Sequence, residues 1–227
     1  MRDISQFETI IGYTFSDREL LDTALTHSSY INEHALERKK CNERLEFLGD
    51  AVLELITSEF LFNDGRDIPE GEMTRQRASL VCESALADDA REIDLGSFLF
   101  MGRGEEQNGG RQRASIVSDA LEAVIGAVYL DGGIEAAGSF IRRFILRDEN
   151  MHLMDAKTVL QEITQEVFLT APVYAITGAE GPDHNRTFTA EVSIDNKVLG
   201  TGTGRTKKTA EQAAALQAIN TIKGNPE

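Results

Sequence analysis

The stretch "NERLEFLGDAVLEL", residues 42–55, decides the fold of the first part of the chain. Its apolar residues recur at helical spacing and predict a helix with one buried face: Leu45, Leu48, Val52 and Leu55. The same helix carries an acidic stripe: Glu43, Glu46, Asp50 and Glu54. Like charges at these spacings face one another and destabilise an isolated helix by roughly 0.2–0.5 kcal/mol per pair. The stripe therefore calls for a partner that offsets its repulsion.

A second stretch, "SDALEAVIGAVYL" at 118–130, places Asp119 and Glu122 on a helix that is apolar on nearly every side. A helix of this kind is expected to be buried, and buried carboxylates are paired or bind a metal because their desolvation is costly. No Lys or Arg lies three or four residues from either acid. We therefore expect Asp119 and Glu122 to be buried beside a cation.

If the two helices pack together, four carboxylates could converge: Glu46, Asp50, Asp119 and Glu122. Oxygen ligands suit Mg²⁺, which prefers carboxylates and retains several waters. No His or Cys, the ligands typical of zinc, accompanies them in these stretches. The spacing alone leaves two interpretations open, a magnesium site or an ordinary solvated helix face.

Charge is distributed unevenly along the chain. The 227 residues carry a formal net charge of −15. Residues 1–154 hold 16 basic and 29 acidic side chains, whereas residues 155–227 hold 7 and 9. Net charge governs solubility and long-range steering, so it does not exclude a local surface that binds nucleic acid. It does predict that RNA would be bound less tightly than by a basic homologue.

The remaining bulk features predict a cytoplasmic protein without a membrane anchor. The longest unbroken apolar run, 123–130, is shorter than the roughly 20 residues that a bilayer requires. The first ten residues lack the apolar segment of a signal peptide. Cys41 and Cys82 are isolated in the sequence and are expected to be free thiols in a reducing compartment.

Two domains are predicted, which gives a mainly α fold overall. Residues 1–147 show helical periodicity, with a flexible loop at 102–110 and a glycine-rich helix end, "DGG", at 131–133. Residues 148–156 are expected to be a linker. Residues 157–224 predict a helix, three strands rich in β-branched residues and a closing helix, which is a small α+β domain of order α-β-β-β-α.

These residues resemble the ribonuclease III family of double-strand-specific endoribonucleases. "NERLEFLGDAVL", "LTHSSY" at 25–30, "EGEMTRQRASLV" at 70–81 and the long stretch at 95–133 occur in the family's order, followed by a domain similar to its double-stranded RNA-binding domain. The resemblance covers nearly the whole chain. It implies an all-helical endonuclease domain that hydrolyses double-stranded RNA with Mg²⁺, for which Mn²⁺ could substitute.

The resemblance also implies roles for particular residues. Matched residue by residue, the metal ligands are Glu46, Asp50, Asp119 and Glu122, of which Asp50 and Glu122 are the two catalytic acids. Glu43 and Glu70 match auxiliary acids of the catalytic valley. The implied products carry 5′-phosphate and 3′-hydroxyl ends with short 3′ overhangs, and the implied substrates are ribosomal RNA precursors and some mRNAs.

A homodimer through the catalytic domain is also implied. Each of its two sites would cut one strand of the duplex. Phe47 and Leu48, which lie beside the acids, are candidates for that interface. Ordinary core packing of Phe47 is the alternative that the sequence leaves open.

Within the second domain, "GTGRTKKTAEQAAA" at 202–215 places Lys207 and Lys208 at a helix start, where cations oppose the helix dipole. That placement favours a phosphate-binding role, although exposed lysines are common. By resemblance, Gln161 and Glu162 on the first helix and His184 in the loop between the first two strands would contact RNA minor grooves. Many such domains have a basic residue at the position of Glu211, which suggests modest affinity here.

Two other functions stay open from the sequence. One is a catalytically idle double-stranded RNA-binding protein of the same fold, against which the four intact acids argue. The other is an unrelated helical metal phosphohydrolase. Such enzymes often use adjacent His-Asp pairs, and no histidine here precedes an aspartate: His27, His34, His152 and His184. His27 is expected to be structural.

Overall fold

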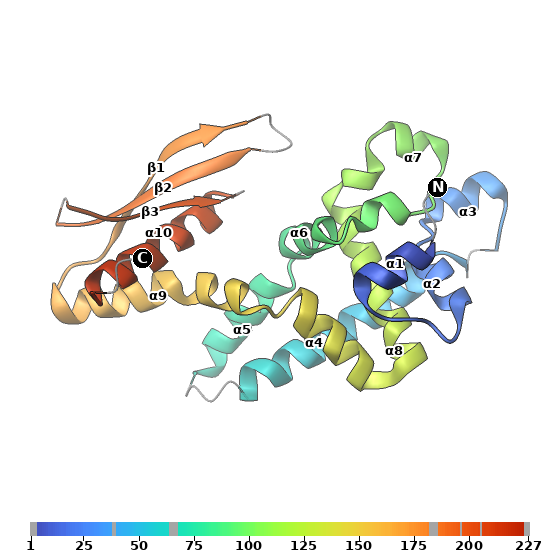
Figure 1. Cartoon of the computed structure of the whole chain (residues 1–227), viewed down its shortest axis with the longest axis horizontal. Helices are drawn as coiled ribbons and strands as arrows, with labels where there is room; N and C mark the ends of the chain where they lie inside the picture. The colour runs from blue at the N-terminus through green and yellow to red at the C-terminus, as the bar shows by residue number, and fades with distance from the viewer. Residues whose placement is uncertain are drawn as a thin grey trace. The chain divides into compact units, whose positions relative to one another are not determined.

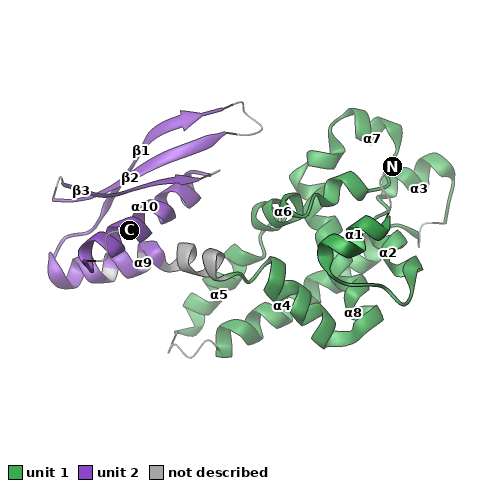
Figure 2. Cartoon of the chain, in the orientation of Figure 1, with its two compact units in different colours: residues 1–147 green, residues 148–227 purple. Residues whose placement is uncertain are grey.

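The structure is a computed structural model that describes residues 4–37, 40–63, 68–181, 186–195, 197–204 and 206–224, without the side chains of 148–155, 158, 162 and 208. The chain forms two compact units, residues 1–147 and residues 148–227 (Figure 2). The first unit is helical and the second combines two helices with a three-stranded sheet. The predicted fold class is therefore confirmed.

The first unit consists of α-helices and short 3₁₀ helices joined by brief connections (Figure 1). In chain order these are α1 (Ile4–Ile11), α2 (Arg18–Ala24), α3 (Ser28–His34), α4 (Glu43–Asn63), α5 (Glu70–Leu80), α6 (Glu83–Glu92), η2 (Leu95–Phe98), α7 (Arg103–Gln107), η3 (Gly110–Gln112) and α8 (Ala114–Phe144). Helix α8 packs against α2, α4 and α6 and supplies much of the buried core.

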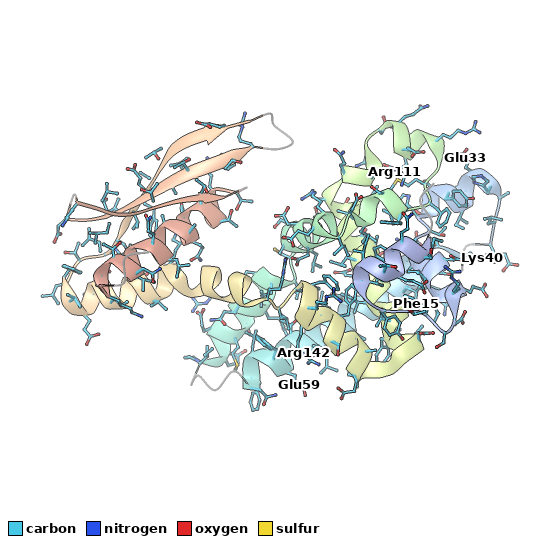
Figure 3. The ribbon with its side chains drawn as sticks, in the orientation of Figure 1. Phe15, Glu33, Lys40, Glu59, Arg111 and Arg142 are labelled. Atoms are coloured by element: carbon cyan, nitrogen blue, oxygen red, sulfur yellow. The ribbon has the colours of Figure 1, made fainter. Side chains whose placement is uncertain are left out.

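Helix α8 consists of two helical segments that meet at the glycine pair 132–133. Gly133 has φ 74° and ψ −173°, a backbone conformation that other residues rarely adopt, and the helix resumes beyond it as far as Phe144. The prediction that a helix ends at the "DGG" stretch is confirmed, because the helical backbone is interrupted at Gly133; a second helical segment, counted within α8, follows directly. Arg142, labelled in Figure 3, lies on the part of α8 that follows this break.

Among the described residues, α8 is the one helix long and apolar enough to cross a membrane by length and composition. This helix was not identified from the sequence, where only unbroken apolar runs were considered. Asp119 and Glu122 interrupt the apolar run, although the helix as a whole remains apolar. Half of its most apolar window is buried inside the protein, and Gly133 breaks its backbone. The burial is that of a helix in the protein core.

Helix α4 has two apolar faces rather than one. Leu45 and Val52 are buried as predicted, but Leu48 is only half-buried and Leu55 is 61% exposed, which contradicts the expectation of a single buried face. Leu55 instead belongs to a second row with Phe47 and Phe62, which are 80% and 76% exposed. Residues 47, 51, 55, 58 and 62 recur at helical spacing, so this row forms a stripe on the side of α4 that faces solvent.

The segment predicted to be a flexible loop, 102–110, contains α7 and leads into η3. Arg111, labelled in Figure 3, holds this segment in place. Its guanidinium donates hydrogen bonds to the carbonyl oxygens of Gly96 and Leu99 at 2.9 and 2.8 Å, and to Glu106 at 2.7 Å. Gly96 and Leu99 lie outside the segment, and Glu106 acts through its side chain. The glycine content of the segment reveals none of these contacts, so it wrongly predicted a flexible loop.

The second unit has the order α9 (Asp148–Val167), β1 (Val173–Glu180), β2 (Thr187–Ile194), β3 (Lys197–Gly204) and α10 (Lys207–Ile222). Its strands pair antiparallel in the order β1-β2-β3. The residues expected to be a linker, 148–156, lie within α9; nothing in "DENMHLMDA" is a glycine or proline that would break a helix. Helices α9 and α10 pack together, and α10 lies against the sheet.

Small residues allow α10 to approach the sheet closely. A Cβ atom added at Gly202 would lie 2.2 Å from the backbone nitrogen of Ala214, and one at Gly200 would lie 2.2 Å from its carbonyl oxygen. The buried core of this unit is rich in alanine for the same reason: Ala190, Ala210, Ala214, Ala215 and Ala218. Larger side chains on either surface would separate the helix from the sheet.

Candidate metal centre and nucleic-acid interface

Two glycines bring α4 and α8 into backbone contact at the point where the acids lie. A Cβ atom at Gly49 would lie 1.8 Å from the carbonyl oxygen of Glu122. A Cβ atom at Gly126 would lie 2.3 Å from the carbonyl oxygen of Leu45. Since Gly49 precedes Asp50 and Glu122 is itself the contact residue, this close crossing determines how near the acidic side chains of the two helices come.

Three of the predicted acids form a cluster at this crossing. Glu46 on α4 and Asp119 and Glu122 on α8 each offer a carboxylate oxygen, and these three oxygens lie within 4.8 Å of one another. All three residues are half-buried. We refer to them as the acid cluster. Three oxygen donors at this separation fit a hard divalent cation.

Asp50 lies beside the acid cluster rather than within it. It is exposed, one helical turn after Glu46. Its charge nevertheless contributes to raising the pKa of both Glu122 and Glu46, so its carboxylate is close to theirs. Asp119 and Glu122, which were expected to be buried, are half-buried. All four acids therefore keep some contact with solvent.

The electrostatics of the acid cluster favour a bound cation. Burial, followed by the neighbouring charges of Asp50, Asp119 and Glu46, raises the pKa of Glu122 to about 8. Burial also raises the pKa of Glu46, followed by the charges of Asp119, Glu43 and Asp50. In the described part of the chain, every charge that shifts the pKa of Glu122 is another carboxylate. The cluster therefore holds protons unless a cation replaces them.

Two neighbours of Asp119 were not identified from the sequence. Burial raises the pKa of Asp119, a hydrogen bond from Ser118 lowers it, and then Glu83 raises it and His27 lowers it. His27 also caps α3, since its Nδ1 accepts a hydrogen bond from the backbone nitrogen of Ser29 at 3.2 Å. The cap agrees with the structural role expected for His27. No spacing in the sequence indicated that Glu83 and His27 approach Asp119.

The two auxiliary acids lie in different surroundings. Glu43 is exposed at the start of α4, and its charge helps to raise the pKa of Glu46. Glu70 is exposed at the start of α5, and its Oε1 accepts a hydrogen bond from Thr74 Oγ1 at 3.2 Å. The structure does not include Glu70 in the acid cluster.

The predicted RNA contacts of the second unit lie on α9 and α10 where the structure describes them. Gln161 is exposed on α9, and Lys207 is exposed as the first residue of α10. Glu162 and Lys208 belong to the same helices, but their side chains lie outside the described part of the chain, and His184 lies outside the described residues altogether. Thr206 and Thr209 form a reciprocal cap that fixes the start of α10.

A carboxylate cluster on crossed helices, followed by an α-β-β-β-α domain, fits a metal-dependent nuclease that acts on double-stranded RNA. A family model described as "Ribonuclease-III-like" matches residues 17–149, and one described as "Double-stranded RNA binding motif" matches residues 156–222. The chain belongs to the ribonuclease III family, and it is a double-stranded RNA-specific endoribonuclease.

Individual relatives agree along nearly the whole length. The chain is 47% identical over 224 residues to Ribonuclease 3 of Oceanobacillus iheyensis, covering 97% of this chain and 98% of the relative. It is 47% identical over 226 residues to Ribonuclease 3 of Listeria welshimeri, covering 98% and 99%. A solved nuclease domain of ribonuclease III from Campylobacter jejuni is 44% identical with a TM-score of 0.59, covering 63% of this chain and 96% of that one.

Proposed function

We propose that the chain hydrolyses phosphodiester bonds of double-stranded RNA with Mg²⁺, which Mn²⁺ can replace, at a site formed by Glu46, Asp50, Asp119 and Glu122. The observation that carries this proposal is the acid cluster, whose three half-buried carboxylates lie within 4.8 Å of one another. Burial raises the pKa of all three carboxylates, and neighbouring acids raise it further; a divalent cation would offset both effects. Oxygen donors without histidine or cysteine favour Mg²⁺ over zinc.

Each acid has a role that follows from its surroundings. Glu46, Asp119 and Glu122 would hold the cation from two helices, and exposed Asp50 would be accessible to water and substrate. When bound, Mg²⁺ would supply a water of lowered pKa and stabilise charge on the phosphate oxygens. Asp50 and Glu122 are the proposed catalytic acids. Glu43 and Glu70 are proposed to act as auxiliary acids at the edge of the site.

The proposed products carry 5′-phosphate and 3′-hydroxyl ends with short 3′ overhangs. The overhangs require two sites acting on opposite strands, and therefore a homodimer. The stripe of Phe47, Leu55 and Phe62 on α4 supports such a dimer, because large exposed apolar patches mark protein interfaces. The related nuclease domain from Campylobacter jejuni has a region involved in dimer formation, which also supports the proposal.

RNA is proposed to be held by Gln161, Glu162 and His184 in minor grooves and by Lys207 and Lys208 at the phosphates. The exposure of Gln161 and Lys207 supports this assignment. Processing of ribosomal RNA precursors and some mRNAs in the cytoplasm is the proposed cellular role, by analogy with the relatives named Ribonuclease 3.

Cleavage of a long duplex RNA tests the proposed site. Asp50→Asn and Glu122→Gln should each lower the cleavage rate roughly a thousandfold, since several kcal/mol of transition-state stabilisation is lost. Both variants should still bind duplex RNA. Glu135→Gln, a matched change at an exposed position of α8, should cut like the parent. Parental rates for Asp50→Asn and Glu122→Gln would refute the site.

The products and the assembly can be measured on the same protein. A 5′-phosphate-dependent exonuclease should degrade the products without prior phosphorylation. Light scattering should give a dimer for the parent and a monomer for Phe62→Asp. A monomeric parent that still leaves 3′ overhangs would exclude the proposed dimer.

A further inference from the structure

Lys157 is the point at which three elements of the RNA-binding unit meet. Its Nζ lies 2.7 Å from Oε2 of Glu211 on α10 and 4.2 Å from the ring centre of Tyr174 on β1. Its backbone nitrogen donates a hydrogen bond of 2.9 Å to Oε1 of Gln212, which is buried. Side chains from α10 therefore hold α9 through both its backbone and a side chain.

The Lys157–Glu211 contact is more than an exposed surface pair. The two side chains are 33% and 25% exposed, and the hydroxyl of Tyr174 beside them is buried. Ala156 and Leu160 on α9 pack into the core next to Ala210 and Ala214 of α10. A partly desolvated pair over a packed core is held in one geometry, in contrast to the mobile pairs of open surfaces.

This pair lies one helical turn from the RNA contacts on each helix. Gln161 follows Lys157 by four residues on α9, and Lys207 precedes Glu211 by four residues on α10. Residues four apart share a helix face. The same faces that meet in the pair therefore continue into the residues proposed to touch 2′-hydroxyls and phosphates.

We propose that Lys157, Glu211 and Gln212 are positioning residues that fix α9 against α10, and so set the spacing between the minor-groove contacts and the phosphate contacts of this domain. The inference rests on the proposed function of Gln161 and Lys207. A fixed spacing selects the A-form duplex, whose successive minor grooves and intervening phosphates lie at defined distances. Glu211 thus supports RNA binding, although its charge has the same sign as RNA.

The direction in which Glu211→Gln changes RNA affinity distinguishes a positioning role from a purely electrostatic one. Glu211→Gln removes a negative charge, so electrostatics alone would strengthen RNA binding. If Glu211 positions α9, the same change weakens binding to a duplex RNA of about 16 base pairs by about five-fold. Binding is measured with the full chain in EDTA, so that no RNA is cut.

Lys157→Met should weaken binding by a similar factor without changing the salt dependence. A lysine that contacts phosphate would instead lower the slope of log affinity against log salt by roughly 0.9. The double variant Lys157→Met with Glu211→Gln should be no weaker than either single variant, because both changes break one interaction. Lys157→Arg should bind like the parent, since it keeps the charge pair.

Discrimination provides a second readout. The affinity ratio between duplex RNA and an RNA–DNA hybrid of the same sequence should fall in Glu211→Gln and stay parental in Glu166→Gln, a matched change at an exposed position of α9. Lys223→Met serves as the control for a lost lysine at an exposed position after α10. Circular dichroism at the assay temperature confirms that each variant is folded.

The outcomes distinguish the two proposals. Tighter binding by Glu211→Gln, additive losses in the double variant, or a reduced salt slope in Lys157→Met would overturn the positioning role while leaving the RNA-binding function intact. A parent chain that shows no duplex binding in EDTA would overturn the proposed RNA contacts, and the positioning role with them.

Discussion

The nuclease unit and the RNA-binding unit are both packed through glycines, but the charges near the two contacts are arranged differently. In each, glycines let backbones approach closely: Gly49 and Gly126 between two helices, Gly200 and Gly202 between helix and sheet. At the first contact the approach gathers carboxylates that repel one another. In the second unit Lys157 and Glu211 instead form an ion pair of opposite charges. Close packing thus creates a site that needs a cation in the nuclease unit. In the RNA-binding unit it creates a rigid arrangement of helix and sheet.

The largest expected effect comes from filling these close contacts. Gly49→Ala places a methyl group 1.8 Å from a backbone oxygen of α8, and Gly202→Ala places one 2.2 Å from a backbone nitrogen of α10. Backbone cannot move aside as a side chain can, so each should lower the free energy of unfolding by about 3 kcal/mol. Hydrogen exchange resolved by peptide should show loss of protection chiefly in the mutated unit.

Gly71→Ala is the matched control for this comparison. Gly71 lies in α5, and no described atom outside its chain neighbours and its own helix backbone lies within 4 Å of an added Cβ. Alanine there should stabilise the protein by roughly 0.5–1 kcal/mol, since glycine is unfavourable inside a helix. Equal loss of protection in both units after Gly49→Ala would mean that the two units do not respond independently.

The acid cluster should make the metal-free nuclease unit less stable as pH rises. The pKa of Glu122 is about 8 in the folded protein and 4.5 without burial, so the folded protein keeps a proton that the unfolded chain has lost. Stability is therefore greatest below about pH 4.5 for this group and falls as pH rises through about 8. The loss is on the order of 2 kcal/mol after allowance for solvent screening.

Thermal unfolding in EDTA across this pH range measures the effect. Glu122→Gln should flatten the decline, because glutamine has no proton to lose, whereas Glu135→Gln on the same helix should leave it unchanged. A parent whose metal-free stability does not fall between pH 5 and about 8 would show that folding does not raise the pKa of Glu122.

The sequence anticipated this contrast in part. Helical spacing predicted the two acidic helices, and β-branched segments predicted the sheet, because both signals are local. The exposure of Asp50 was not predicted. Spacing shows that Asp50 shares a helix face with Glu46, but it does not show which part of that face α8 covers. The helix at 103–107 was missed because Arg111 stabilises that segment through carbonyls of Gly96 and Leu99.

The contact between Lys157 and Glu211 was also beyond sequence reasoning. These residues are 54 positions apart, and no periodicity connects two helices separated by a sheet. Glu211 appeared only as a departure from a basic pattern, with modest RNA affinity as its consequence. The contact with Lys157 gives Glu211 a second proposed role, in positioning α9, which is visible only from the packing of α9 on α10.

Metal binding should release protons in proportion to the raised pKa values of the cluster. A cation needs the ionised carboxylates, so below about pH 8 it must displace the proton on Glu122. The affinity for Mg²⁺ should therefore rise by up to about tenfold per pH unit until about pH 8 and then level off. Titration calorimetry in two buffers of different ionisation enthalpy measures the released protons. A pH-independent affinity would contradict the electrostatic account of the cluster.

The smallest expected effect concerns the two lysines at the start of α10 in the RNA-binding unit. Lys207 is exposed at the start of α10, with no acidic residue in the first turn to offset it. Lys207→Ala together with Lys208→Ala should weaken duplex binding and lower the slope of log affinity against log salt by about 2, since each phosphate contact contributes roughly 0.9. Cleavage at saturating RNA should remain near parental, because the acid cluster is untouched. An unchanged slope would remove both lysines from the phosphate contacts and leave RNA binding in this unit to α9 and the loop before β2.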